Sequence, residues 1–337
     1  MEAIEKDSDH FYELRTGTPA GTIFIATMRS RLHLALQILT LLTLPISVGC
    51  SLGDMQAQPP KALAPLLEYA GSWGAKGGLP WQLDDPVSIS TDALGNVYIV
   101  DAGSLFIHKF SPQGTPLLSF QKDPLKHPEW ITLDRGGAIY VSDPARSSIF
   151  IFLPDGDHYR ELRLKTRSKE NMVSVAVGWD GLIHVLDSSA AKVFTFTPRL
   201  RLVQSWQPAG TSSGSRAQPG PIEMGPEGDL YVANAGTIMR FTREGHLVSE
   251  IGANSSGSGA RWSDKFAVSG NYLFVMGIDG RQLHIWTLDG KPKLDLDLAP
   301  QLGQGARPAP ALAVSPKGEL LVLDAQEARV LRYRINF

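Results

Sequence analysis

The stretch GNVYIVDAGSLFIHKFSPQG, from Gly95 to Gly114, contains two short runs of β-forming residues separated by a turn. A second stretch, GAIYVSDPARSSIFIFLPDG, runs from Gly137 to Gly156 and has the same arrangement. Valine, isoleucine, tyrosine and phenylalanine favour strands, and the Gly, Pro, Asp and Ser residues around them favour turns. Each stretch therefore predicts a β-hairpin, and the repetition indicates that the hairpin is one unit of a larger array.

Six segments share this order of strand, turn and strand. They begin at Gly95, Gly137, Gly181, Gly228, Asn271 and Gly318, at intervals of 42, 44, 47, 43 and 47 residues. Another β-run precedes each hairpin, and a fourth generally follows it after a Gly or Pro turn. Four strands about every 44 residues are typical of propeller blades. Because one blade cannot bury both of its apolar faces alone, we expect an all-β fold, a six-bladed β-propeller with four-stranded blades.

The two ends of the repeat region together complete the sixth blade, which otherwise has only three strands. The sixth unit ends with its third strand, and the β-run Leu67–Trp73 precedes the first unit. We expect Leu67–Trp73 to pair beside Arg329–Ile335 and to close the ring, because the last blade would otherwise expose a long apolar edge. The propeller would then occupy residues 65–337.

The units resemble NHL repeats, whose pattern is a Pro-led inner strand, a Gly-containing turn, and strands of the form vYVaD and rIqkF. The resemblance covers about residues 65–337 and is strongest in DPVSISTDALGNVYIVDAGSLFIHKFSPQG, from Asp85 to Gly114. It is weakest in the fifth unit, where Gly277 replaces the aspartate. The resemblance implies a functional surface at the mouth of the central channel.

The N-terminal region has the layout of a secretory signal peptide. Arg29 and Arg31 precede the apolar run Leu32–Leu44, which ends shortly before the only cysteine of the chain, Cys50. A cysteine at the cleavage point resembles a bacterial lipoprotein signal and makes Cys50 the expected site of lipidation. Ser47 stands where that pattern usually has leucine, so ordinary cleavage and an uncleaved anchor remain alternatives.

This layout divides the chain into four parts. Residues 1–27 are an over-extended gene start or a short cytoplasmic extension, 28–50 the signal peptide, 51–64 a flexible tether and 65–337 the propeller. We expect an exported protein on a lipid anchor, with protein partners in the cell envelope. Because Ser51 follows the cysteine where an aspartate would favour inner-membrane retention, we expect the outer membrane in a cell with two membranes.

The composition of the chain argues against an internal disulfide and against nucleic-acid binding. A single cysteine allows no disulfide within the chain. A net charge of −2 gives no electrostatic support for nucleic-acid binding, which usually requires a basic face. We expect a monomeric propeller without a nucleic-acid partner.

The loops that lead into the inner strands carry aromatic and charged residues suited to binding a partner or a polar ligand. The candidate binding residues at the channel mouth are Trp81, Asp84, Asp85, Lys126, His127, Glu129, Trp130, Arg261, Trp262 and Arg307, and the same loops contain Lys169, Glu170 and Arg216. The alternative is that the charges are merely solvated and the tryptophans fill gaps between blades.

A metal-dependent lactonase- or lyase-like enzyme is the second hypothesis for the function. Such propellers hold a divalent ion with several carboxylates, amides or histidines on the innermost strands. Here only Glu129 and Glu223 are ionisable candidates, and they lie two blades apart. We therefore expect no catalytic residue, no metal and no cofactor.

A series of aspartates, one in most units, offers another possible metal site. Its members are Asp101, Asp143, Asp187 and Asp324, with Asn234 at the equivalent place. Because they would be spread around the ring, we expect each carboxylate to accept hydrogen bonds from backbone amides of the turn that it begins.

Overall fold

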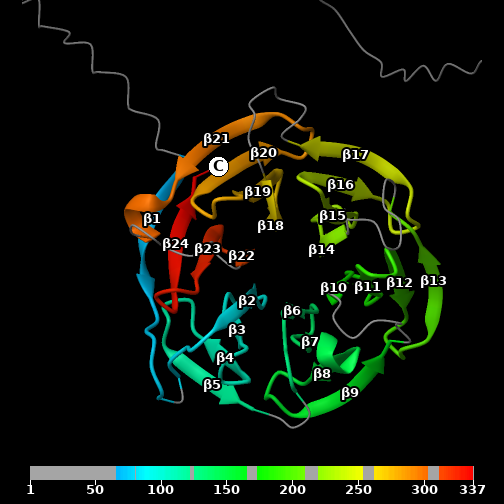
Figure 1. The fold of residues 1–337 in the computed structure, drawn as a ribbon, viewed down its shortest axis with the longest axis horizontal. Helices are drawn as coiled ribbons and strands as arrows, with labels where there is room; N and C mark the ends of the chain where they lie inside the picture. The colour runs from blue at the N-terminus through cyan, green and yellow to red at the C-terminus, as the bar shows by residue number, and fades with distance from the viewer. Residues whose placement is uncertain are drawn as a thin grey trace, which may run out of the picture. The chain divides into compact units, whose positions relative to one another are not determined.

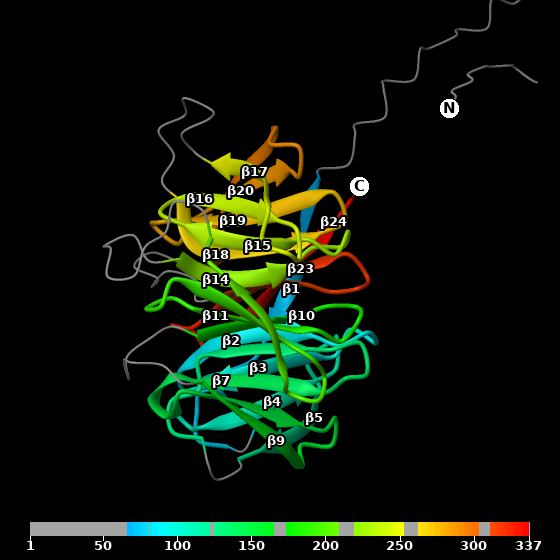
Figure 2. The same cartoon turned by 90° about the vertical axis from the view of Figure 1, so that its right-hand side faces the viewer.

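In the part of the chain that the structure describes, 24 strands form six four-stranded antiparallel sheets, arranged as blades around a central channel (Figure 1). This computed structural model describes residues 66–79, 81–121, 125–164, 173–208, 219–252, 262–302 and 311–336. Figure 2 shows the ring from its edge, with the strands crossing from one face to the other. The predicted six-bladed propeller is confirmed.

The first three blades follow one another along the chain from the inner strand to the outer strand. Blade 1 contains β2 (Pro86–Thr91), β3 (Val97–Asp101), β4 (Phe106–Phe110) and β5 (Pro116–Phe120). Blade 2 contains β6 (Trp130–Leu133), β7 (Ile139–Asp143), β8 (Ser148–Phe152) and β9 (His158–Arg163). Blade 3 contains β10 (Val173–Val177), β11 (Ile183–Asp187), β12 (Lys192–Phe196) and β13 (Leu202–Trp206).

The remaining blades follow the same order until the ring closes. Blade 4 contains β14 (Pro219–Met224), β15 (Leu230–Asn234), β16 (Thr237–Phe241) and β17 (Leu247–Gly252). Blade 5 contains β18 (Trp262–Ser269), β19 (Tyr272–Gly277), β20 (Gln282–Thr287) and β21 (Pro292–Asp297). Blade 6 contains β22 (Ala311–Val314), β23 (Glu319–Asp324), β24 (Arg329–Ile335) and, as its outer strand, β1 (Leu67–Trp73).

The expected closure is present in blade 6. β1 pairs antiparallel with β24, with Leu67 opposite Ile335 and Trp73 opposite Val330. A short 3-10 helix (η1, Pro144–Arg146) and a four-residue α-helix (α1, Ala299–Leu302) complete the described structure. Among the described residues, no helix has the length and apolar character needed to cross a membrane.

The second strand of a blade is buried on both faces. In β3, Tyr98 and Val100 pack toward blade 2, whereas Val97 and Ile99 pack toward blade 6. Successive side chains of a strand point to opposite faces, so one strand contributes to two cores. This is why VYIVD is apolar nearly throughout rather than alternating with polar residues.

Candidate functional site

The loop before β2 forms an ordered part of the channel mouth. Lys76 and Leu83 form a parallel bridge across this loop, and the Leu83 side chain is completely buried. The carboxylate of Asp101, at the end of β3, accepts hydrogen bonds from the amides of Asp84 (2.7 Å) and Asp85 (2.8 Å). A buried side chain of the second strand therefore holds the loop in place.

The local environment keeps Asp101 ionised. Burial alone would raise the pKa of this carboxyl group, but the His108 ring and the amides of Asp84 and Asp85 lower the pKa well below its ordinary value. The His108 Nε2 atom lies 3.8 Å from Asp101 Oδ2. Hydrogen bonds from amides to a carboxylate are stronger than those between neutral groups, which suits an anchor for a loop.

The other aspartates of the series also serve the backbone. Asp143 accepts hydrogen bonds from the amides of Lys126 (2.5 Å) and His127 (3.2 Å) in the loop before β6. Asp187 accepts from the amide of Ser189, and Asp324 from that of Glu327, in their own turns. The expectation of amide donors in the residue's own turn is confirmed for Asp101, Asp187 and Asp324. The amides that donate to Asp143 belong instead to the loop before β6, and Asp101 also accepts from the loop before β2, which a local turn motif does not predict.

Five predicted mouth residues are exposed on these two loops. Trp81 is 48% exposed, and the neighbouring Leu79, which the sequence analysis did not single out, is 52% exposed. The other four exposed residues are Asp84, Asp85, Lys126 and His127. We call these six residues, from Leu79 to His127 on neighbouring blades 1 and 2, the mouth surface.

Glu129 and Trp130 lie deeper than the mouth surface. Both are half-buried, and His127 Nδ1 lies 3.2 Å from Glu129 Oε1. Burial raises the pKa of the Glu129 carboxyl group, although His127 acts in the opposite direction. Trp130 begins β6 and lines the channel.

Trp262 differs from the expectation of an exposed aromatic anchor. Its side chain is only 4% exposed and packs within the core between blades 4 and 5. The ring centroid of Trp262 lies 5.1 Å from that of Trp286 and 6.3 Å from that of His284. As the first residue of β18, Trp262 fills the gap between blades, which was the alternative considered for these tryptophans. Arg261, Arg307, Lys169, Glu170 and Arg216 lie outside the described residues.

The central channel contains a cavity of about 260 Å³, lined by residues of all six inner strands. Neighbouring inner strands belong to different sheets, so side chains rather than a backbone ladder link them. Three such links are the hydrogen bonds from Ile131 N to Ser88 Oγ (3.2 Å), from Ile222 N to Ser174 Oγ (3.0 Å) and from Val268 N to Glu223 Oε2 (3.1 Å).

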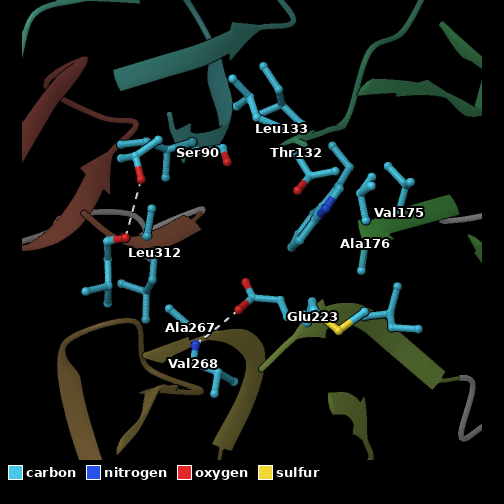
Figure 3. Close-up of a pocket in the computed structure, with 18 of the residues that line it drawn as sticks. Ser90, Thr132, Leu133, Val175, Ala176, Glu223, Ala267, Val268 and Leu312 are labelled. Carbon is cyan, nitrogen blue, oxygen red and sulfur yellow. Dashed lines mark hydrogen bonds between the residues drawn. The ribbon is translucent and has the colours of Figure 1, made fainter. Parts of the chain in front are cut away.

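The sequence analysis places the ionisable residue Glu223 on an inner strand, and the structure confirms this position on β14. Glu223 also lines the cavity. Its side chain is half-buried, and Figure 3 shows its carboxyl group facing the cavity. Burial raises the pKa of Glu223 to about 8, although the hydrogen bond from the Val268 amide lowers it. Among the described residues, no three His, Cys, Asp or Glu side chains form a group that could hold a metal ion.

Comparison with known proteins supports the fold. No known family profile matches the chain, and no curated protein matches it. A streptogramin B lyase structure is 13% identical, with a TM-score of 0.60 over 79% of this chain and 98% of that one. The β-propeller domain of Myceliophteria thermophila Cps50 (Swd1) is 10% identical, with a TM-score of 0.58 over 80% and 100% of the two chains.

A third similar structure is virginiamycin B lyase from Staphylococcus aureus, which is 14% identical, with a TM-score of 0.55 over 80% of this chain and 89% of that one. Two of these similar structures are described as lyases, and the third is described as a β-propeller domain. At such low identity they show the fold alone. The chain is a six-bladed β-propeller.

Proposed function

We propose that this propeller is an exported, lipid-anchored binding module of the cell envelope, built from NHL-type repeats, and that a protein partner docks on its mouth surface. The observation that carries the proposal is the exposure of Leu79 and Trp81 on a loop fixed by Asp101. Tryptophan is enriched among the residues that dominate binding energy, and a loop that is already ordered loses little entropy on binding. The charged neighbours Asp84, Asp85 and Lys126 supply a polar rim.

The partner can be sought by placing a photo-crosslinking amino acid at position 81 in the envelope-exported protein. We expect a discrete crosslinked product there and none at position 159. Tyr159 is a matched control because it is 52% exposed but lies on the outer strand β9. Once the partner is identified, Trp81→Ala should weaken its binding at least tenfold, and Tyr159→Ala should not. Equal crosslinking at both positions would contradict the proposed surface.

The proposed anchor rests on the sequence around Cys50. In Cys50→Ser the thiol that accepts the lipid is lost, so we expect the protein to move from the membrane fraction to the soluble fraction. Fractionation of cells that express each form measures this shift. A Cys50→Ser protein that stays with the membrane would favour an uncleaved anchor instead.

A lyase-like enzyme is the second candidate, and the similarity to two lyase structures favours it. A divalent ion such as Ca²⁺ needs six to eight oxygen ligands. The described cavity offers one carboxylate, that of Glu223, together with the hydroxyls of Ser90, Thr91 and Thr132. This set does not fit a metal-assisted reaction, and no reaction step is derived from it.

A further inference from the structure

Aliphatic side chains are the most numerous residues around the channel cavity, although the surface that the cavity exposes is mainly polar. Val175, Ala176, Ala267 and Leu312 line it from three blades (Figure 3), and Trp130 of blade 2 adds an aromatic residue to the lining. A cavity of about 260 Å³ lies just below the volume range of common ligand pockets, from roughly 300 Å³ upward. Its size is therefore suited to a small molecule, whose body would contact the aliphatic side chains and Trp130 of the lining.

Three polar side chains from different blades lie among these aliphatic residues. Figure 3 shows that Glu223 of blade 4, Ser90 of blade 1 and Thr132 of blade 2 direct their oxygen atoms toward the cavity. Glu223 Oε2 accepts the hydrogen bond from Val268 N. Among the described residues, Glu223 Oε1 has no hydrogen-bond partner, and Figure 3 shows this oxygen facing the cavity.

Among the described residues, no positively charged group contributes to the electrostatic environment of Glu223. The titratable groups on the strands packed against β14 are Asp264 and Lys265 on β18, Tyr231 on β15, and His184 and Asp187 on β11. The pKa of Glu223 is nevertheless set by burial and by the Val268 amide alone. An acid held in this way destabilises the folded state at neutral pH, a cost that a ligand with positive charge would relieve.

We propose that the channel cavity binds a small organic cation, a primary ammonium group on an apolar body, with the ammonium on Glu223. An ammonium group has three N–H donors, and Glu223, Ser90 and Thr132 offer acceptors from three directions. The aliphatic walls and Trp130 would cover the apolar body, and an aromatic face also attracts a cation.

We expect the ligand to enter at the end of the cavity that lies away from the mouth surface. Trp179, on the turn between β10 and β11, is 67% exposed and also lines the cavity. This turn lies at the opposite end of the inner strand from the mouth loops, because it follows β10 whereas the mouth loops precede their inner strands. Ligand binding and partner docking can therefore be tested separately, and failure of one leaves the other standing.

The test is calorimetric titration of the folded propeller with benzylamine, cyclohexylamine and butylamine, and with benzyl alcohol and benzoate as uncharged and anionic counterparts. We expect at least one amine to bind, and to bind at least tenfold more tightly than benzyl alcohol or benzoate. Glu223→Gln should weaken amine binding at least tenfold, and Glu250→Gln, at an exposed position on the outer strand β17, should leave it unchanged.

A second readout follows the proton of Glu223. At pH 7 a carboxyl group with a pKa of about 8 is mostly protonated, so binding of an ammonium group should release about 0.9 proton to the buffer. Titrations in buffers with different ionisation enthalpies measure this number. For the same reason the affinity should be about tenfold weaker at pH 6 than at pH 7.

Glu223→Gln retains an oxygen that can accept the Val268 hydrogen bond, so a melting temperature at pH 7 no lower than that of the wild type shows an intact ring. Binding of no amine, equal binding of benzylamine and benzyl alcohol, or unchanged amine binding by Glu223→Gln would each overturn the proposal. Calcium that binds in the cavity and displaces the amine would overturn it as well, and would make the cavity a metal site.

Discussion

Asp101, the buried aspartate at the end of β3, does two tasks in this protein. It accepts a hydrogen bond from Gly103 N (3.1 Å) within its own turn, and it fixes the loop that leads into the inner strand β2. Without the carboxylate, several main-chain amides would lose their acceptor near the core. Asp101 therefore links the stability of its blade to the order of the mouth loop.

We predict that Asp101→Asn lowers the free energy of unfolding by about 2 kcal/mol at pH 7, because charge-assisted hydrogen bonds to two loop amides are weakened. The pKa of Asp101 is depressed in the folded state, so the unfolded chain takes up the proton first as the pH falls. The difference in unfolding free energy between the wild type and Asp101→Asn should therefore decrease below about pH 4. Urea unfolding at pH 7, 5 and 3.5 measures this difference.

Asp155→Asn is the control for this experiment, because Asp155 is exposed and accepts the amide of Asp157 on the surface. We expect the control to stay within about 0.5 kcal/mol of the wild type. An Asp101→Asn protein with unchanged stability would mean that water replaces the carboxylate at no cost.

At the scale of elements, aromatic residues near the ends of outer strands lock neighbouring blades together. Trp73 of β1 packs against Phe110 with ring centroids 4.9 Å apart, and it covers Gly114 in the turn between β4 and β5. Phe120 covers Gly156 in the same way. The recurrence of such residues in GSW, LSF and QSW is a sequence signal that the repeat analysis overlooked.

We predict that Gly114→Ala is markedly more destabilising than Gly290→Ala. Both glycines close the same kind of turn, with φ values of 87° and 84°. A Cβ at Gly114 would lie 2.3 Å from Trp73 Cγ, whereas a Cβ at Gly290 would meet no atom within 4 Å. We expect losses of about 3 kcal/mol and about 1 kcal/mol, respectively, from chemical denaturation. Equal losses would show that only the backbone conformation matters.

At the scale of the whole molecule, stability depends on closure of the ring by the two ends of the repeat region. β1 contributes the buried Leu67 to the core between blades 5 and 6, and Trp73 to the core between blades 6 and 1. Each blade also shares a core with both of its neighbours, as β3 does. Unfolding of one blade should therefore destabilise the other blades of the ring.

We predict that a chain shortened to begin at Gly74 loses about 3 kcal/mol or more of unfolding free energy, from the lost burial of Leu67 and Trp73. The exposed edge of β24 should also promote association. Thermal melting and hydrogen exchange measure the effect, and a peptide of residues 66–74 added in trans should partly restore the protein. An unchanged midpoint, with loss of protection in blade 6 alone, would contradict cooperative closure.

The fold could be predicted from sequence because its signals are local and repeated. Strand runs, turn residues and a nearly constant interval specify a blade. Closure is specified by the extra strand before the first unit and the missing fourth strand of the last unit. The aspartates could likewise be assigned to the backbone, since their position after a strand is part of the repeat. The number of blades in such a protein can therefore be predicted from sequence without knowledge of the tertiary contacts.

Only the tertiary structure decided which residues near the channel can contact a partner or a ligand. Trp81, Trp130 and Trp262 occupy similar places in sequence, each before or at the start of an inner strand. One is exposed on a loop, one lines the cavity and one is buried between blades. The raised pKa of Glu223 likewise depends on strands of several blades. The physical reason is that the environment of a side chain in a ring is set by the neighbouring blades, which are distant along the chain.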